Sequence, residues 1–185
     1  MIKETLKDAD SRMNGAIQSL ESDLSGIRTG RASAALVDRI QVEYYGAPTP
    51  LLQLATISVP EPRSLMIKPF DPSTMKEIER AILASDLGIT PNNDGKAIRL
   101  NLPPLTEDRR KELVKVVKSR VEEARVAVRN VRRDVMKDLK EIENEKLASE
   151  DERKTGEADL QKLTDKYVEE IDSIGEKKQE EIMEV

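Results

Sequence analysis

The stretch LVKVVKSRVEEARVAVRNVRRDVMKDLKEI, residues Leu113–Ile142, decides the fold of this chain of 185 residues. Apolar residues recur in it every three or four positions, at Leu113, Val117, Val121, Ala124, Val128, Val131, Val135, Leu139 and Ile142. This spacing forms one face of an α-helix and is typical of helical bundles and coiled coils. A helix from Glu107 to Glu145 would have 39 residues, which predicts a rod of about 58 Å.

Two other segments have the same periodicity. The first runs through Ile2, Leu6, Ala9, Met13, Ala16, Leu20, Leu24 and Ile27, and the second through Leu160, Leu163, Tyr167, Ile171, Ile174 and Ile182. Thr106 is the predicted N-cap of the middle helix, and Ser149 with Glu152 forms a capping box before the last one. The short connection at 144–148 predicts that the last two helices run antiparallel.

Residues 31–104 have a different pattern and contain all nine prolines. Period-two alternation or short apolar runs predict strands at 40–44, 54–59, 65–70 and 97–102, with turns or loops at 46–50 and 91–95. Asp71 and Pro72 predict the start of a short helix that Gly88 ends. The sequence therefore predicts an α+β fold. An elongated three-helix bundle of residues 1–30 and 105–185 receives an inserted β/α/β domain of residues 31–104.

Two short segments connect the predicted domains. Gly30 and Arg31 lie in one segment, and Pro103 and Pro104 lie in the other. Glycine allows the backbone of its connecting segment many conformations, whereas the two prolines restrict the backbone of the other segment. A hinge and a rigid elbow are both compatible with this pattern.

The residue types that are missing exclude much chemistry. The chain has no Cys and no His, which removes thiolate ligands, the commonest metal ligand and the usual general base near neutral pH. It also has no phosphate-binding loop and no glycine-rich dinucleotide turn. We therefore expect no catalytic residue, no metal site, no cofactor and no enzyme. The charged N-terminus and the lack of a long apolar run predict a cytoplasmic protein without a membrane segment.

The charge is unevenly distributed. Residues 105–137 carry a net charge of +5, whereas residues 138–185 carry −9. A stripe beside the apolar seam of the middle helix consists of Lys111, Lys115, Lys118, Glu122, Arg125, Arg129 and Arg132. One interpretation is a solvated face balanced by acidic residues of the other helices. The other is a footprint for a phosphate backbone, which the forked guanidinium groups of Arg125, Arg129, Arg132 and Arg133 would suit.

Three classes of function remain open on these residues. The first is an RNA-binding factor that acts mechanically. The second is a helical scaffold that binds only proteins, with the seam paired to another chain. The third, which the missing residue types disfavour, is an enzyme that depends on a bound metal or nucleotide.

Several blocks of the sequence resemble bacterial ribosome recycling factors. They are residues 27–32 (IRTGRA), 42–51 (VEYYGAPTPL), 84–88 (ASDLG), 102–107 (LPPLTE), 125–134 (RVAVRNVRRD) and 162–165 (KLTD). The resemblance covers the whole chain in order. Gly26 departs from it, because the family commonly has Lys there, and Ile89-Thr90 replaces the commoner Leu-Asn.

The resemblance implies an L-shaped, monomeric translation factor without an active site. Its bundle would lie along the large ribosomal subunit with Arg129 and Arg132 on ribosomal RNA, and with Arg110, Arg133 and Arg28 as weaker candidates. The inserted domain would meet elongation factor G. GTP hydrolysis by that factor would then drive separation of the ribosomal subunits and release of mRNA.

Overall fold

The computed structural model of the chain describes residues 1–184 and consists of two compact units. The first comprises residues 1–24 and 114–180, and the second comprises residues 25–113 together with the residues from 181 onward. The division of the sequence into domains at residues 30 and 105 stays a prediction.

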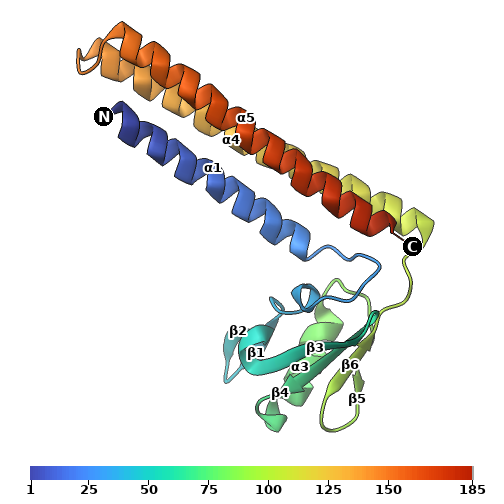
Figure 1. Cartoon of the computed structure of the whole chain (residues 1–185). Coiled ribbons are helices and arrows are strands. Elements are labelled where there is room, and N and C mark those ends of the chain that lie inside the picture. Colours follow the sequence, from blue (N-terminus) through green and yellow to red (C-terminus); the bar gives the residue numbers. More distant parts are fainter. Residues whose placement is uncertain (185) are drawn as a thin grey trace. The chain divides into compact units, whose positions relative to one another are not determined.

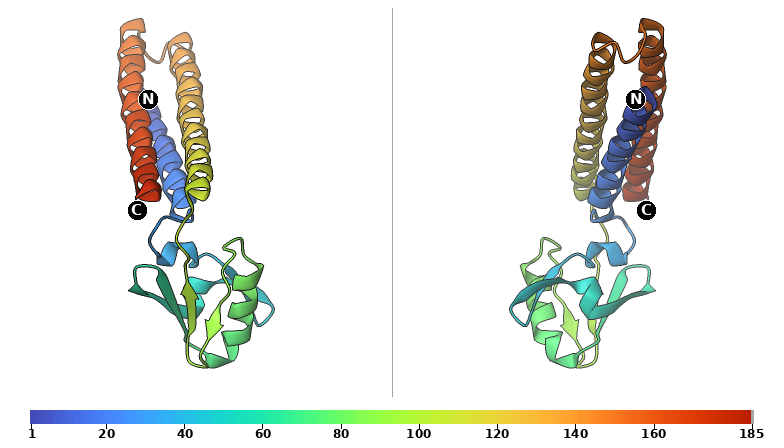
Figure 2. Two further views of the ribbon diagram at one scale, coloured as in Figure 1. Left: turned by 90° about the vertical axis from the view of Figure 1, so that its right-hand side faces the viewer. Right: turned by 90° about the vertical axis from the view of Figure 1, so that its left-hand side faces the viewer.

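Three long helices form the bundle (Figure 1). They are α1 (Ile2–Ser25), α4 (Glu107–Asn144) and α5 (Glu150–Met183). A tight loop joins α4 to α5, and the two helices run antiparallel, as the short connection predicts (Figure 2). The observed bounds of α4 differ from the predicted helix by one residue at its C-terminal end.

Both predicted N-cap residues accept a backbone hydrogen bond, whereas the reciprocal bond of the capping box, from the N–H of Ser149 to the Glu152 carboxylate, is not formed among the described residues. The backbone N–H of Arg109 donates to Oγ1 of Thr106 at 3.1 Å, and that of Glu152 donates to Oγ of Ser149, also at 3.1 Å. Each bond satisfies one of the backbone donors that a helix leaves free at its N-terminus. The chain then leaves α4 through Lys146, which has a φ of 60° and so stops the helix.

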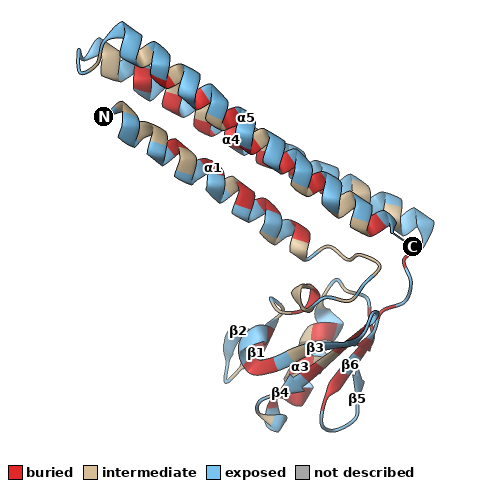
Figure 3. Ribbon diagram, viewed as in Figure 1, coloured by how far each residue is buried: buried red, intermediate tan, exposed pale blue. Residues whose placement is uncertain are grey.

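The apolar seams meet in the core of the bundle (Figure 3). Val117, Val128, Val135 and Leu139 of α4 are fully buried. In the other two helices most of the predicted seam residues are buried, and the seam differs from the prediction at single positions. Ile17 is buried where Ala16 was expected, and Thr164 and Gly175 are buried beside the half-buried Leu163 and Ile174. Tight packing requires the smallest residue at 175, because a Cβ there would lie 2.5 Å from Cγ2 of Val121.

The second unit is built around a four-stranded antiparallel sheet with the strand order β3-β4-β6-β5. The strands are β3 (Ala55–Glu61), β4 (Ser64–Pro69), β5 (Asn92–Asn93) and β6 (Ile98–Asn101). The cross-strand pairs Leu65–Leu100 and Ile67–Ile98 are fully buried. Ile78 and Ile82 of α3 (Met75–Ala84) join the same apolar core. The helical bundle and the sheet-and-helix unit confirm the predicted α+β fold.

A separate hairpin corrects one prediction. Residues 46–50 were expected to form a turn or loop, but β1 (Gln41–Tyr44) pairs with β2 (Ala47–Pro50). The turn is confined to Tyr45 and Gly46, whose φ values of 50° and 79° suit a two-residue hairpin. β2 has one neighbouring strand, so its prolines interrupt no second ladder.

Three smaller elements also differ from the predictions. The one-turn helix α2 (Leu51–Leu54) was not predicted, and β5 occupies part of the expected turn at 91–95. α3 ends at Ala84, before Gly88, and the hydroxyl of Ser85 donates to the carbonyl oxygen of Ile82 at 2.5 Å. A side chain that satisfies a terminal carbonyl ends a helix without glycine.

The proposed hinge segments both belong to the second unit. The N–H of Ala32 donates to the carbonyl oxygen of Pro62 at 2.6 Å, and that of Leu102 donates to the carbonyl oxygen of Arg63 at 2.8 Å. The residue after Arg31 and the residue before Pro103 are thus both hydrogen-bonded to the connection between β3 and β4. Movement at Gly30, Arg31, Pro103 and Pro104 stays a prediction.

Candidate nucleic-acid interface

The arginine-rich stripe of α4 faces a row of carboxylates on α5. Asp165, Glu169, Asp172 and Glu176 follow one another at steps of four, three and four residues, the spacing of a helix face. Together with α4 they line two open grooves of about 430 and 570 Å³. Asp172 lines both grooves, so it lies where they adjoin.

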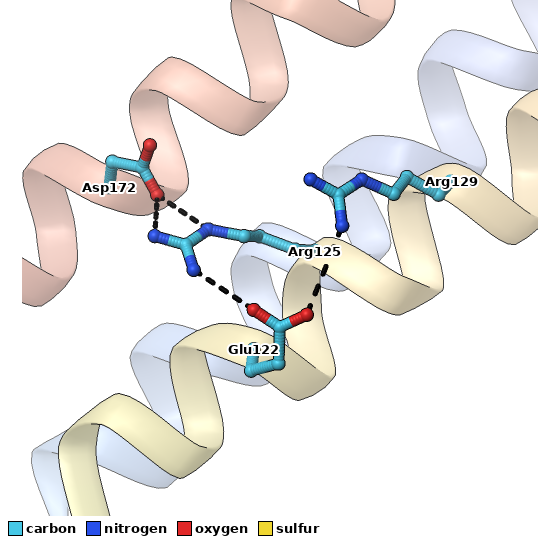
Figure 4. Close-up of polar contacts among 4 residues, drawn as sticks. All are labelled: Glu122, Arg125, Arg129 and Asp172. Carbon is cyan, nitrogen blue, oxygen red and sulfur yellow. Dashed lines mark hydrogen bonds and ion pairs between the residues drawn. The ribbon is translucent and has the colours of Figure 1, made fainter. Parts of the chain in front are cut away.

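Arg125 is held between two carboxylates (Figure 4). Its Nε lies 2.7 Å and its Nη2 2.5 Å from Oδ1 of Asp172, while Nη1 lies 3.0 Å from Oε2 of Glu122. Hydrogen bonds to Asp172, and then to Glu122, raise the pKa of Arg125 above its usual value. The side chain of Arg125 is 31% exposed and stays charged, but the two carboxylates balance its charge. The predicted RNA contact of this residue stays a prediction.

Arg129 is much more loosely tied. Its Nη1 lies 3.8 Å from Oε1 of Glu122, beyond hydrogen-bond distance, and its side chain is 53% exposed. Figure 4 shows the Arg125 and Arg129 guanidinium groups against different oxygens of the same Glu122 carboxylate. An exposed pair of this kind contributes little stability. The charge of Arg129 is therefore available to a ligand.

Arg132 is oriented by a neutral partner. Its Nη1 donates to Oε1 of Gln161 at 3.3 Å, and Nε2 of Gln161 donates to Oδ1 of Asp165 at 2.8 Å. The amide holds the guanidinium in place but does not neutralise it, because glutamine carries no charge. Arg129 and Arg132 line the same groove of about 430 Å³. The two arginines thus share one open groove with the carboxylates of Asp165, Glu169 and Asp172.

The other three candidates have different surroundings. Arg133 is exposed on α4 and makes no ion pair within residues 1–184. Arg28 and Arg110 belong to the second unit, whereas Arg125, Arg129, Arg132 and Arg133 lie in the first. Four of the six predicted residues thus lie in the first unit, and two of them, Arg129 and Arg132, line one groove.

Arg28 is half-buried among like charges. Its Nε and Nη2 atoms are buried and have no hydrogen-bond partner in the described chain, and Nε of Arg110 is in the same condition. Burial lowers the pKa of Arg28, and the nearby charges of Arg109 and Arg63 lower it further. An unpaired cation in such a place contributes positive potential at the surface of the second unit.

The α5 carboxylates are the part of the site that sequence reasoning missed. Acidic residues on the other helices were considered as a general balance for the stripe, but Asp172 and Gln161 were not identified as partners. Their helical spacing was visible in the sequence, whereas the face of α5 that meets α4 was not. Two carboxylates balance the charge of Arg125. The charge of Arg129 faces one distant carboxylate, and Arg132 is held by an uncharged amide.

Other kinds of site find no support in the part of the chain that the structure describes. No group of three or more Asp or Glu side chains within it could hold a metal ion. Within the same residues, no helix is both long and apolar enough to cross a bilayer. The arginine groove of α4 and α5 remains as the candidate site.

Comparison with known proteins identifies the family of the chain. The model of the family described as ribosome recycling factor matches residues 20–183. The chain belongs to the ribosome recycling factor family. The ribosome-recycling factors of Roseiflexus castenholzii and Halalkalibacterium halodurans are 55% and 57% identical over the full length of both chains.

Two solved structures of ribosome recycling factors are also similar. A solution structure has 46% identity and a TM-score of 0.80, and covers 100% of this chain and 98% of its own. The other, also 46% identical, has a TM-score of 0.69 with full coverage of both chains. It describes the Thermus thermophilus ribosome recycling factor and the Escherichia coli elongation factor G on the E. coli post-termination complex. The resemblance of the sequence blocks to ribosome recycling factors is thereby confirmed.

Proposed function

We propose that this protein binds the ribosome after translation has terminated. With elongation factor G, and with GTP hydrolysed by that factor, it separates the subunits and releases the mRNA for recycling. The proposal is supported by family membership over the whole chain and by the similar recycling factor described on a post-termination complex. In this scheme the protein has no active site of its own and works as a monomer in the cytoplasm.

The observation that carries the proposal is the groove of Arg129 and Arg132. The two guanidinium groups line one open surface, one of them tied loosely to a carboxylate and the other held by an amide. Planar guanidinium groups bind phosphate oxygens through paired N–H donors. We assign the groove, with the neighbouring Arg133, to the backbone of ribosomal RNA in the large subunit.

The remaining predicted residues have secondary places in this proposal. Arg28 and Arg110 contribute positive potential on the second unit, where they would approach RNA independently of the groove. Arg125 acts indirectly, because its donors are already bound to Asp172 and Glu122. The sheet-and-helix unit is assigned to the contact with elongation factor G.

An Arg132→Ala variant tests the proposal. The affinity of the variant for large ribosomal subunits, measured by cosedimentation, should fall by about 1–3 kcal/mol with helical content unchanged. Arg120→Ala is a matched control, because Arg120 is an exposed arginine of α4 paired with Glu123 at 3.0 Å outside the groove. Equal losses in the two variants would contradict the assignment.

Salt provides a second test. Phosphate contacts release counterions, so the affinity of the wild-type protein for large subunits should fall steeply as the concentration of KCl rises. The slope should be shallower for Arg132→Ala, which loses one such contact. An affinity that does not respond to salt would exclude the groove as a phosphate site.

A further inference from the structure

Glu122 stands out because it is the acidic member of an otherwise cationic stripe. Its two carboxylate oxygens contact different arginines, Oε2 facing Arg125 at 3.0 Å and Oε1 facing Arg129 at 3.8 Å (Figure 4). A neutral or basic residue here would lengthen the basic row. The carboxylate instead lies where it competes with phosphate for Arg129.

The two arginines differ in how firmly they are held. Arg125 has Asp172 as a second and closer partner across the helix pair, so it stays bound when Glu122 is lost. Arg129 has no second carboxylate within ion-pair distance among the described residues. Glu122 thus binds Arg125 together with Asp172, and it makes a weaker, longer ion pair with Arg129.

We infer that Glu122 is a positioning and selectivity residue of the RNA-binding row, which rests on the function proposed above. In the free protein it holds the guanidinium of Arg129 near α4. When RNA presents a phosphate at the groove, Arg129 exchanges the carboxylate for the phosphate, while Arg125 remains with Asp172. The exchange costs the same for every RNA, but RNA that fits the whole groove has further contacts that keep it bound.

The physical basis is the cost of breaking an exposed ion pair. Such a pair contributes up to about 1 kcal/mol, which corresponds to a binding penalty of about fivefold or less. The penalty is the same in free energy for every RNA that takes Arg129, so it lowers every affinity by the same factor. A shaped partner with further contacts at Arg132 and Arg133 binds tightly enough to stay bound, whereas a weak, scattered complex loses more of its occupancy.

The test compares Glu122→Gln with Glu123→Gln. Both changes remove one negative charge from neighbouring positions of α4, but Glu123 pairs with Arg120 rather than with Arg129. Binding to poly(U) is measured by fluorescence anisotropy across a KCl series, and binding to large ribosomal subunits is measured by cosedimentation. Far-UV circular dichroism checks that both variants remain helical.

We expect Glu122→Gln to bind poly(U) about two- to fivefold more tightly at low salt, with a steeper salt dependence. Its affinity for large subunits should rise by a similar factor, and Glu123→Gln should match the wild type on both partners. In an Arg129→Ala background the Glu122→Gln change should have no effect. This last result separates release of Arg129 from a general change in charge.

Two outcomes would overturn the inference while leaving the proposed function intact. One is equal behaviour of the Glu122→Gln and Glu123→Gln variants when the wild type binds large subunits normally. The other is an undiminished effect of Glu122→Gln after Arg129 has been removed. A wild-type protein that fails to bind large subunits would instead overturn the proposed function, and the inference with it.

Discussion

The hydroxyl of Tyr167 on α5 donates a hydrogen bond to Oδ1 of Asp10 on α1, with 2.5 Å between the two oxygens. Tyr167 is only 5% exposed. Burial in the bundle, followed by the hydrogen bond to Asp10 and its charge, raises the pKa of Tyr167 to about 12. This contact joins the first and last helices of the chain, which are far apart in sequence.

Tyr167→Phe should therefore destabilise the bundle by about 1 kcal/mol at neutral pH, because Asp10 loses a buried donor. The folded pKa lies above the unfolded value of about 10, so the contribution is complete below pH ~10 and is lost as the pH rises towards about 12. Urea unfolding of both proteins across this range measures the effect. Tyr45→Phe, at an 86% exposed residue, should change nothing. A difference between wild type and Tyr167→Phe that persists above pH ~12 would contradict this assignment.

Gly175 permits the closest approach of α5 to α4. An alanine Cβ there would lie 2.5 Å from Cγ2 of Val121, so we expect Gly175→Ala to destabilise the protein by about 1–3 kcal/mol despite its better helix propensity. At Gly15 an added methyl group would meet no atom within 4 Å, and Gly15→Ala should stabilise α1 by up to about 1 kcal/mol. Thermal unfolding compares the two. Adding Val121→Ala should relieve part of the Gly175→Ala loss, and strict additivity would show that the clash is absent.

Arg125 and Asp172 should be coupled in stability. A double-mutant cycle of Arg125→Ala and Asp172→Ala should give a coupling energy of about 0.5–1 kcal/mol that decreases with salt, as for partly exposed ion pairs. Arg133→Ala, at an exposed residue of the same helix, should leave stability within about 0.5 kcal/mol of the wild type. Zero coupling at low salt would mean that Arg125 is not engaged by α5 in solution.

The Pro103-Pro104 crossing offers a test of the hinge. Deleting Pro104 leaves the hydrogen bond from Leu102 to Arg63 in place but shortens the chain that follows it. We expect normal binding to large subunits but slower subunit splitting with elongation factor G and GTP, followed by light scattering. Splitting at the wild-type rate would show that the length of this crossing is not needed.

Much of the fold could be predicted from local patterns. The three-four periodicity around Val128 and the caps at Thr106 and Ser149 located the long helices, because periodicity and capping depend on residues within one or two turns. The strands through Leu65 and Ile98 were likewise found from short apolar runs. The hairpin strand at 47–50 was missed, since its two prolines are acceptable only on a strand that lacks a second neighbour.

The sequence by itself determined which residues form helices and that cations concentrate on the middle one. Only the tertiary structure decided which of those cations are available, because Arg125 and Asp172 are 47 residues apart and meet through the packing of two helices. The rotation of each helix about its axis depends on how closely its neighbours approach, as at Gly175 and Val121. That rotation brings a carboxylate to Arg125 but an amide to Arg132, and so balances the charge of the first arginine and only orients the second.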